Sequence, residues 1–390
     1  MKQIYNWCSS VKGLCSLSTV ILVVMAMACS DMDDLHQPFL DRGEITYAAK
    51  VDSVIARTGN SRIQFDLVIQ SQRIKTVRIF WNDYKDPGAD LIRFRDSSDV
   101  EIAGKGLIRK ILNDMPERSY IFKLVSFDEF GNQSLPTEVH AYVYGPKYEK
   151  LLVARSMRST MVDKVGNLRI NWGVADGAYG SEVRYTDVSG KVKSHIFPII
   201  QDTPPVSLIT DIKGDTPFEY RTVYRPDTTG IDNFNTPYVR VDPPFAFDKT
   251  EWTIKDKSTN HDGNDNKVEN FIDGTEATRW HSKAGGGSSY PHYASIDMGS
   301  VRTVTTVGLW ITTFETPGGD QRAPNRIQFL ISMDNVTWTD LGEFDFNRML
   351  LGEQRFVMPA GAQGQYLKFV AVSGPVNDQM VMGEISAYGF

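Results

Sequence analysis

Cysteine is scarce in this chain and is confined to one end of it. The 390 residues contain three Cys, and all of them, Cys8, Cys15 and Cys29, fall within the first 29 positions. The remainder of the chain therefore has no disulfide, no thiol nucleophile and no thiolate metal ligand.

Basic residues are not in excess, and familiar catalytic patterns are missing. The 42 Lys and Arg are outnumbered by 48 Asp and Glu, which gives a net charge of −6. Nucleic-acid binding requires a basic face, so the composition gives no case for that class. The sequence also contains no GxSxG elbow and no HxxxH pair. Without such a pattern, we expect a protein that is not an enzyme.

One apolar run stands out in the sequence, LSTVILVVMAMA at residues 17–28, and it is too short to span a bilayer as a transmembrane helix. Lys2 and Lys12 precede the run, and the small residues Ala26 and Ala28 end it. This pattern predicts a secretory signal peptide at residues 1–28.

The residue after that segment is Cys29, and SDMDD follows it. The arrangement resembles a bacterial lipoprotein signal with Cys29 as the lipidated residue, although Ala26 replaces the usual larger aliphatic residue. The acidic stretch resembles the signal that sends Bacteroidetes lipoproteins to the cell surface. These resemblances imply an outer-membrane protein held by a lipid anchor alone, with residues 29–43 as a tether. The alternatives are an ordinary cleaved signal with an incidental Cys and a solvated acidic linker.

Two segments with period-two alternation follow, separated by polar turns. In the first, residues 44–145, Ile63, Phe65 and Leu67 alternate with polar residues, and the same happens in the second, residues 146–242. The similar order of strands and turns in both predicts two immunoglobulin- or fibronectin-III-like sandwiches related by duplication. Only residues 99–112 leave room for a short helix.

Three stretches in this half resemble a domain of unknown function found in Bacteroidetes lipoproteins of polysaccharide-utilisation systems. They are FLDRGEITYAAKVDSV (39–54), IFWND (79–83) and VYGPKY (143–148). The resemblance implies a spacer that lifts a C-terminal module off the membrane.

Two prolines after Asp242 stiffen the backbone and mark the next boundary. From residue 243 to 390 apolar residues again alternate, for example at Ile296 and Met298 and at Val307, Leu309 and Ile311. This predicts a third β module, a jelly-roll barrel or sandwich with loops clustered at one end.

Four motifs in this module occur in a characteristic order. They are NFIDGTEATRWHS (270–282), PHYASIDMGS (291–300), RIQFLISMDNVTWTDLG (326–342), and QYLKFVAV with GEISAYGF (365–390). Together they resemble the discoidin-like, coagulation-factor type C domain, whose bacterial members include family 32 carbohydrate-binding modules. The expected fold class is therefore all-β, with two immunoglobulin- or fibronectin-III-like sandwiches followed by a discoidin-like jelly-roll sandwich.

The resemblance implies a structural Ca²⁺ that ties the first loop to the last strand. Its ligands would be Asp273, Thr275, Thr278 and Glu384, which offer the hard oxygen atoms that Ca²⁺ prefers. In the alternative interpretation, Asp273 caps a turn and Glu384 is a solvated edge residue.

The resemblance also places a glycan site on the loops 282–292, 312–325 and 373–379. Aromatic faces bind sugar C–H surfaces and planar polar groups bind hydroxyl pairs. The loops offer Tyr290, His292, Phe314, Arg322 and Asn377, with His281 and Trp310 at their border. Trp280 and Trp338 fit core positions better. The alternative for each loop residue is an ordinary surface position.

These features predict a non-catalytic, surface-anchored lipoprotein that captures polysaccharide or oligosaccharide for an outer-membrane uptake system. The resemblance implies an import barrel and its lid lipoprotein as partners. The alternative is a structural or protein-interaction subunit of that complex without a glycan site. A glycosidase is the third class, but the three modules leave no room for a catalytic barrel of roughly 250 residues.

Overall fold

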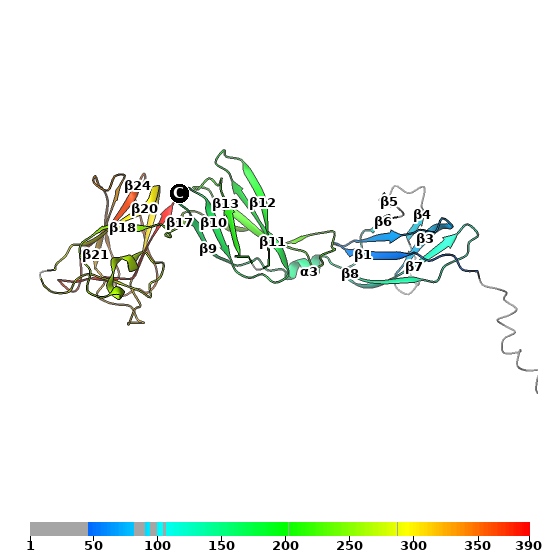
Figure 1. Ribbon diagram of the computed structural model, residues 1–390, viewed down its shortest axis with the longest axis horizontal. Coiled ribbons are helices and arrows are strands. Elements are labelled where there is room, and N and C mark those ends of the chain that lie inside the picture. Colours follow the sequence, from blue (N-terminus) through cyan, green and yellow to red (C-terminus); the bar gives the residue numbers. More distant parts are fainter. Residues whose placement is uncertain (1–45, 82–89, 94–99, 104–106, 202, 287) are drawn as a thin grey trace, which may run out of the picture. The chain divides into compact units, whose positions relative to one another are not determined.

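The computed structural model describes residues 46–81, 90–93, 100–103, 107–201, 203–286 and 288–390 (Figure 1). The chain divides into two compact units, Met1–Tyr144 and Gly145–Phe390. In the described ranges nearly all regular structure is strand, which confirms the predicted all-β fold class. The expected signal peptide, Cys29 and the tether lie outside these ranges. No helix in the described part of the chain is long and apolar enough to cross a bilayer.

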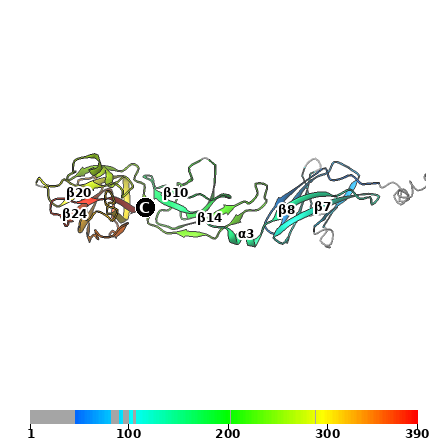
Figure 2. The ribbon, with the colours of Figure 1, turned by 90° about the horizontal axis from the view of Figure 1, so that it is seen from below.

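The first unit is a sandwich of two four-stranded antiparallel sheets (Figures 1 and 2). One sheet has the order β1 (Ser53–Thr58), β2 (Ile63–Val68), β6 (Leu107–Leu112), β5 (Val100–Ala103). The other has the order β4 (Asp90–Arg93), β3 (Ile74–Phe80), β7 (Arg118–Asp128), β8 (Thr137–Val143). The alternating apolar residues meet between the sheets, where the rings of Phe65 and Phe122 lie 4.9 Å apart, edge to face.

The short helix considered for residues 99–112 is wrong. The described residues of that segment, 100–103 and 107–112, form β5 and β6, which pair with each other and continue the sheet from β2. Within β6, Ile108, Lys110 and Leu112 are buried while Ile111 is exposed, so the period-two pattern decides the local structure.

The second unit begins with the short helix α3 (Pro146–Leu151) and a second sandwich. One of its layers contains β9 (Met157–Val162), β10 (Leu168–Trp172) and β13 (Val206–Ile209). The other contains β11 (Ala178–Thr186), β12 (Val192–Pro198), β14 (Phe218–Tyr224), β15 (Phe234–Asn235) and β16 (Val239–Val241). Trp172 is fully buried between them and contacts the ring of Tyr220.

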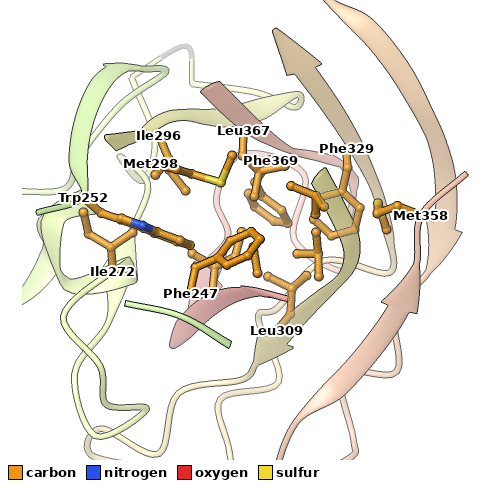
Figure 3. Close-up of a cluster of buried hydrophobic side chains, with 14 of the residues drawn as sticks. Phe247, Trp252, Ile272, Ile296, Met298, Leu309, Phe329, Met358, Leu367 and Phe369 are labelled. Atoms are coloured by element: carbon orange, nitrogen blue, oxygen red, sulfur yellow. The ribbon is translucent and has the colours of Figure 1, made fainter. Parts of the chain in front are cut away.

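The C-terminal module is organised around the 19-residue strand β20 (His292–Trp310). Its first part pairs with β18 (Thr253–Lys257) and β24 (Gln363–Ser373), and β24 continues to β21 (Arg326–Ser332) and β22 (Thr339–Asp345). Its second part pairs with β23 (Gln354–Val357) and β26 (Glu384–Gly389), which leads to β17 (Phe245–Phe247). One strand thus supplies both layers, and their inner faces enclose Phe247, Phe329 and Phe369 (Figure 3).

Strand β17 also joins this module to the sandwich before it. It pairs in parallel with β9 through Ala246 and Phe247, so residues 146–242 and 243–390 share one sheet. The buried Arg302 donates a hydrogen bond to the carbonyl oxygen of Asp163 and lies over the Phe247 ring.

At the loop end, β19 (Trp280–His281) pairs with β25 (Val381–Met382), beside two 3₁₀ turns, η1 (Asn264–Asn266) and η2 (Val268–Phe271). Trp280 is fully buried, as its sequence context predicts. The core position expected for Trp338 is wrong, because this ring is half-buried and carries the Lys368 ammonium group 4.0 Å from its centre.

Candidate functional site

Arg322 is the most firmly positioned of the predicted sugar-binding residues. Its Nε atom lies 2.9 Å from Oδ1 and 3.1 Å from Oδ2 of Asp320, and Nη2 also donates to Oδ2. Asp320 is 5% exposed, whereas the Arg322 side chain remains 36% exposed. Burial alone would raise the pKa of Asp320, but the hydrogen bonds from Arg322 hold that pKa below its ordinary value. The buried Asp320 carboxylate therefore holds the Arg322 guanidinium group in a position where it is partly exposed to solvent.

His281 holds the same guanidinium group from a second side. Its Nε2 atom lies 2.9 Å from Nη1 of Arg322, while Nδ1 contacts the carbonyl oxygen of Ser282. Because a carbonyl accepts and a guanidinium donates, the proton is assigned to Nδ1 and Nε2 accepts. Burial, and then the charge of Arg322, lower the pKa of His281 and so favour this neutral form.

Tyr290 and His292 lie together beneath the loops. Their rings are 4.9 Å apart, and the Tyr290 hydroxyl donates a 3.2 Å hydrogen bond to the carbonyl oxygen of Gln379. Burial raises the pKa of Tyr290 to about 12. His292 is 1% exposed, so its ring lies below the surface that a ligand would meet.

Phe314 belongs to a neighbouring cluster around Arg279. The Arg279 guanidinium group lies 4.6 Å from the centre of the Phe314 ring and donates to Glu315 and to Asn266. Glu315 also raises the pKa of Arg322, after the larger effect of Asp320, so this cluster borders the Arg322 site.

Asn377 is exposed on the third loop. The next residue, Asp378, accepts a 2.8 Å hydrogen bond from the backbone N–H of Gly285 and so links the third loop to the first. The side chains that hold Arg322 thus come from the second predicted loop and from β19, while the first and third loops contact each other.

Of the two residues that hold Arg322, the sequence-based prediction misses Asp320 and names His281 only as a residue at the border of the loops. Asp320 stands two positions before Arg322, and this Asp-x-Arg spacing is a short-range signal for the pair. For His281 no such signal exists, because its partner is 41 positions away and the contact forms only in the folded module.

Three of the proposed Ca²⁺ ligands, Asp273, Thr275 and Thr278, lie in the segment 270–278, which precedes the three predicted glycan loops. The Thr278 hydroxyl oxygen lies 2.8 Å from Oδ2 of Asp273 and 3.1 Å from the carbonyl oxygen of Thr275. It is also 3.3 Å from the carbonyl oxygen of Asn270. A hydroxyl group has one proton and can satisfy one of these three acceptors. Four oxygen atoms that converge with a single shared proton fit a hard cation.

Glu384 reaches the same loop from the last strand. Its Oε2 atom accepts a 2.6 Å hydrogen bond from the backbone N–H of Gly274, and Oε1 lies 2.6 Å from Nζ of Lys249. Burial raises the pKa of Glu384 to about 7. Within the described residues no group of three or more His, Cys, Asp or Glu is placed to hold a metal. A cation here would therefore depend on carbonyl and hydroxyl oxygen atoms beside the two carboxylates.

The loop end presents a fixed, half-exposed guanidinium group on the second loop and an exposed amide on the third, and both groups can donate hydrogen bonds to hydroxyl oxygen atoms. The module that carries it is an F5/8 type C domain, whose family model matches residues 253–384. The preceding half matches the model of DUF4998, described as a domain of unknown function, over residues 29–234. The chain belongs to the DUF4998 family.

Comparison with curated proteins finds a sialidase of Micromonospora viridifaciens, 29% identical over 171 residues. The match covers 42% of this chain and 25% of the sialidase, so the chain spans about a quarter of that relative's length.

Solved structures similar to the chain cover its C-terminal module. The C-terminal domain of a chitobiase from Bacteroides fragilis is 25% identical, with 37% of this chain and 97% of that chain covered and a TM-score of 0.33. The family 32 carbohydrate-binding module of Clostridium perfringens NanJ, in complex with galactose, is 19% identical, with 37% and 97% covered and a TM-score of 0.32.

Proposed function

We propose that this protein is a non-catalytic, cell-surface glycan-binding lipoprotein that captures polysaccharide for an outer-membrane uptake system. The F5/8 type C module would hold the glycan, and the preceding β-sandwiches would act as a spacer. The observation that carries the proposal is the guanidinium group of Arg322, which Asp320 and His281 fix at the loop end while leaving it half-exposed.

A guanidinium group held in this way is already ordered before ligand arrives. A flexible arginine loses side-chain freedom when it binds, at a cost of about 0.5–1.5 kcal/mol per immobilised side chain. Here Asp320 and His281 have already restricted Arg322, so less free energy is lost on binding. The remaining N–H groups can donate in parallel to a pair of sugar hydroxyl groups.

The proposed membrane anchor and uptake complex rest on the N-terminal sequence around Cys29. Lipidation of Cys29 would confine many copies to one surface, and weak single-site contacts would then act together on a long polysaccharide. An import barrel and its lid lipoprotein are the proposed partners. Replacing Cys29 with Ser should release the protein from the membrane fraction, and surface protease treatment of whole cells would report the orientation.

A structural Ca²⁺ is also part of the proposal. The converging oxygen atoms of Asn270, Asp273, Thr275 and Thr278, with Glu384 beside them, would hold the ion. The ion would supply positive charge that links the first loop of the module to its last strand, and no catalytic role is proposed for it.

A glycan array probed with residues 30–390 tests the binding function. We expect selective binding that is lost in Arg322→Ala and retained in Arg326→Ala, a control arginine on β21 that is 46% exposed and paired with Glu343 and Asp345. A blank array from a folded chain would contradict the proposal and would favour a protein-interaction subunit. Pull-down of the uptake complex would then be the next experiment.

A further inference from the structure

His281 makes two hydrogen bonds that together require the neutral imidazole. Its Nδ1–H donates to the carbonyl oxygen of Ser282, so only Nε2 is left to accept from Arg322. The ring is 4% exposed and sits on β19, which pairs with β25, so it cannot turn freely toward solvent. An added proton would have to go on Nε2, at the atom that faces Arg322.

We propose that neutral His281 is the positioning residue that keeps Arg322 in its glycan-binding orientation, and that acid therefore switches the site off. This inference rests on the proposed function of the Arg322 site and adds that pH regulates glycan binding there. Protonation of Nε2 would replace an acceptor with a second donor and would bring an imidazolium beside a guanidinium group.

The positively charged groups around His281 make protonation of its Nε2 atom unfavourable. Arg322 lies against Nε2. Arg279, directly before β19, and His261, between β18 and η1, also lower the pKa of His281, and His292 on β20 lies within electrostatic range of it. The His261 ring is 4.9 Å from that of His281.

Asp320 and, more weakly, Glu315 supply negative charge to Arg322, and both oxygen atoms of Asp320 already accept from it. A protonated His281 would compete for the Asp320 carboxylate and would no longer accept from Arg322, whose 36% exposed side chain could then move toward solvent. The expected result is a displaced guanidinium group.

The size of the effect follows from the fraction of neutral His281. If only the neutral form is competent, the apparent Kd equals the intrinsic Kd divided by that fraction. Each pH unit below the pKa of His281 then raises the apparent Kd about tenfold. Because burial lowers this pKa from its ordinary value of 6.5, the loss should begin only below that value.

The test uses residues 30–390 and galactose as the probe, titrated by calorimetry between pH 7.5 and 4.5. The wild-type Kd should rise about tenfold per pH unit once His281 titrates. In His281→Gln the Gln Oε1 atom can still accept from Arg322 but does not titrate, so its Kd should vary less than twofold over the range. His195→Gln, at an exposed position on β12, should follow the wild type.

A second measurement does not depend on glycan binding. In ¹⁵N-histidine-labelled wild type, the His281 ring should show the Nδ1–H tautomer at pH 7.5, and the Arg322 Nε–H resonance should shift as His281 titrates. Absence of galactose binding at pH 7.5 would count against the proposed function for that sugar and leave these spectra as the test. A His281→Gln variant that keeps the wild-type pH profile, or an Arg322 resonance that ignores His281 titration, would overturn the inference.

Discussion

The ammonium group of Lys249 lies 2.6 Å from Oε1 of Glu384, and both side chains are largely buried. Lys249 also donates to the carbonyl oxygen of Ile385, and Glu384 accepts from the backbone N–H of Gly274. The pair therefore connects the start of the C-terminal module to its last strand and to the loop of the proposed Ca²⁺ site.

Removing one member of this pair should destabilise the protein strongly. Lys249→Met leaves the carboxyl group of Glu384 buried without its cation, and we expect a loss of about 3–5 kcal/mol in the free energy of unfolding. Urea unfolding would measure it. Lys164→Met is the control, because its ion pair with Glu251 is exposed and should contribute little. Equal losses of unfolding free energy in the two variants would contradict the expectation that the buried ion pair contributes more than the exposed one.

Gly374 should not tolerate a side chain. A Cβ atom there would overlap the hydroxyl group of Tyr290, which the close approach of the third loop brings against the backbone. We expect Gly374→Ala to weaken both glycan binding and thermal stability, and Tyr290→Phe in the same chain to restore part of the stability. Gly352→Ala offers a contrast, because nothing lies near its Cβ position, although its φ of +87° adds strain of its own. A Gly374→Ala variant with wild-type Tm would refute this packing argument.

Asp320→Asn should lower glycan affinity without removing any proposed sugar contact. Hydrogen bonds to charged groups contribute about 1.5–3 kcal/mol, so loss of the carboxylate should free Arg322 and raise Kd by roughly one to two orders of magnitude. Asp340→Asn, an exposed aspartate that caps Gly342, is the matched control. Calorimetry with the strongest array ligand measures both, and unchanged affinity in Asp320→Asn would show that Arg322 needs no support.

The same carboxylate should contribute to acid stability. The pKa of Asp320 is lower in the folded state than its ordinary value of 3.8, so the unfolded chain binds more protons as pH falls. The stabilisation is therefore fully present above about pH 4 and is lost as pH falls through the folded pKa. In Asp320→Asn the stability should fall less steeply over that acid range. Parallel pH profiles of unfolding for wild type and variant would contradict this assignment.

Calcium should raise the Tm of the protein if the proposed site binds it. At a concentration one hundred times Kd, a ligand specific to the folded state adds about 2.7 kcal/mol. Asp273→Asn and Thr278→Val should lose most of this gain, and Mg²⁺ should replace Ca²⁺ poorly because it requires a stricter octahedral geometry. Calorimetric melts with Ca²⁺, with Mg²⁺ and with EDTA would decide. A Tm that does not change with Ca²⁺ would contradict the proposed site and would show that the loop is held by hydrogen bonds alone.

The all-β class follows from alternation, because side chains on a strand point to opposite faces in turn. The burial of Trp280 does not, because both residues of β19 are buried. Trp338 shows the limit of that reasoning. An aromatic residue beside a strand can serve the core or cover a neighbour, and here it covers Lys368, which lies 30 positions away. The site shows the same limit. Arg322 is recognisable by its residue type and loop position, but its support by His281 depends on how β19 is placed against the loops.

The pairing of β17 with both β9 and β26 has a mechanical consequence. A polysaccharide pulled into a pore would exert tension on the loop end of the last module. That tension would reach the preceding sandwich through backbone hydrogen bonds and the buried Arg302, so no slack linker would absorb it between residues 242 and 245. A captured chain would then transmit its pull through the sheet, and single-molecule stretching should show residues 145–390 giving way at one force instead of two.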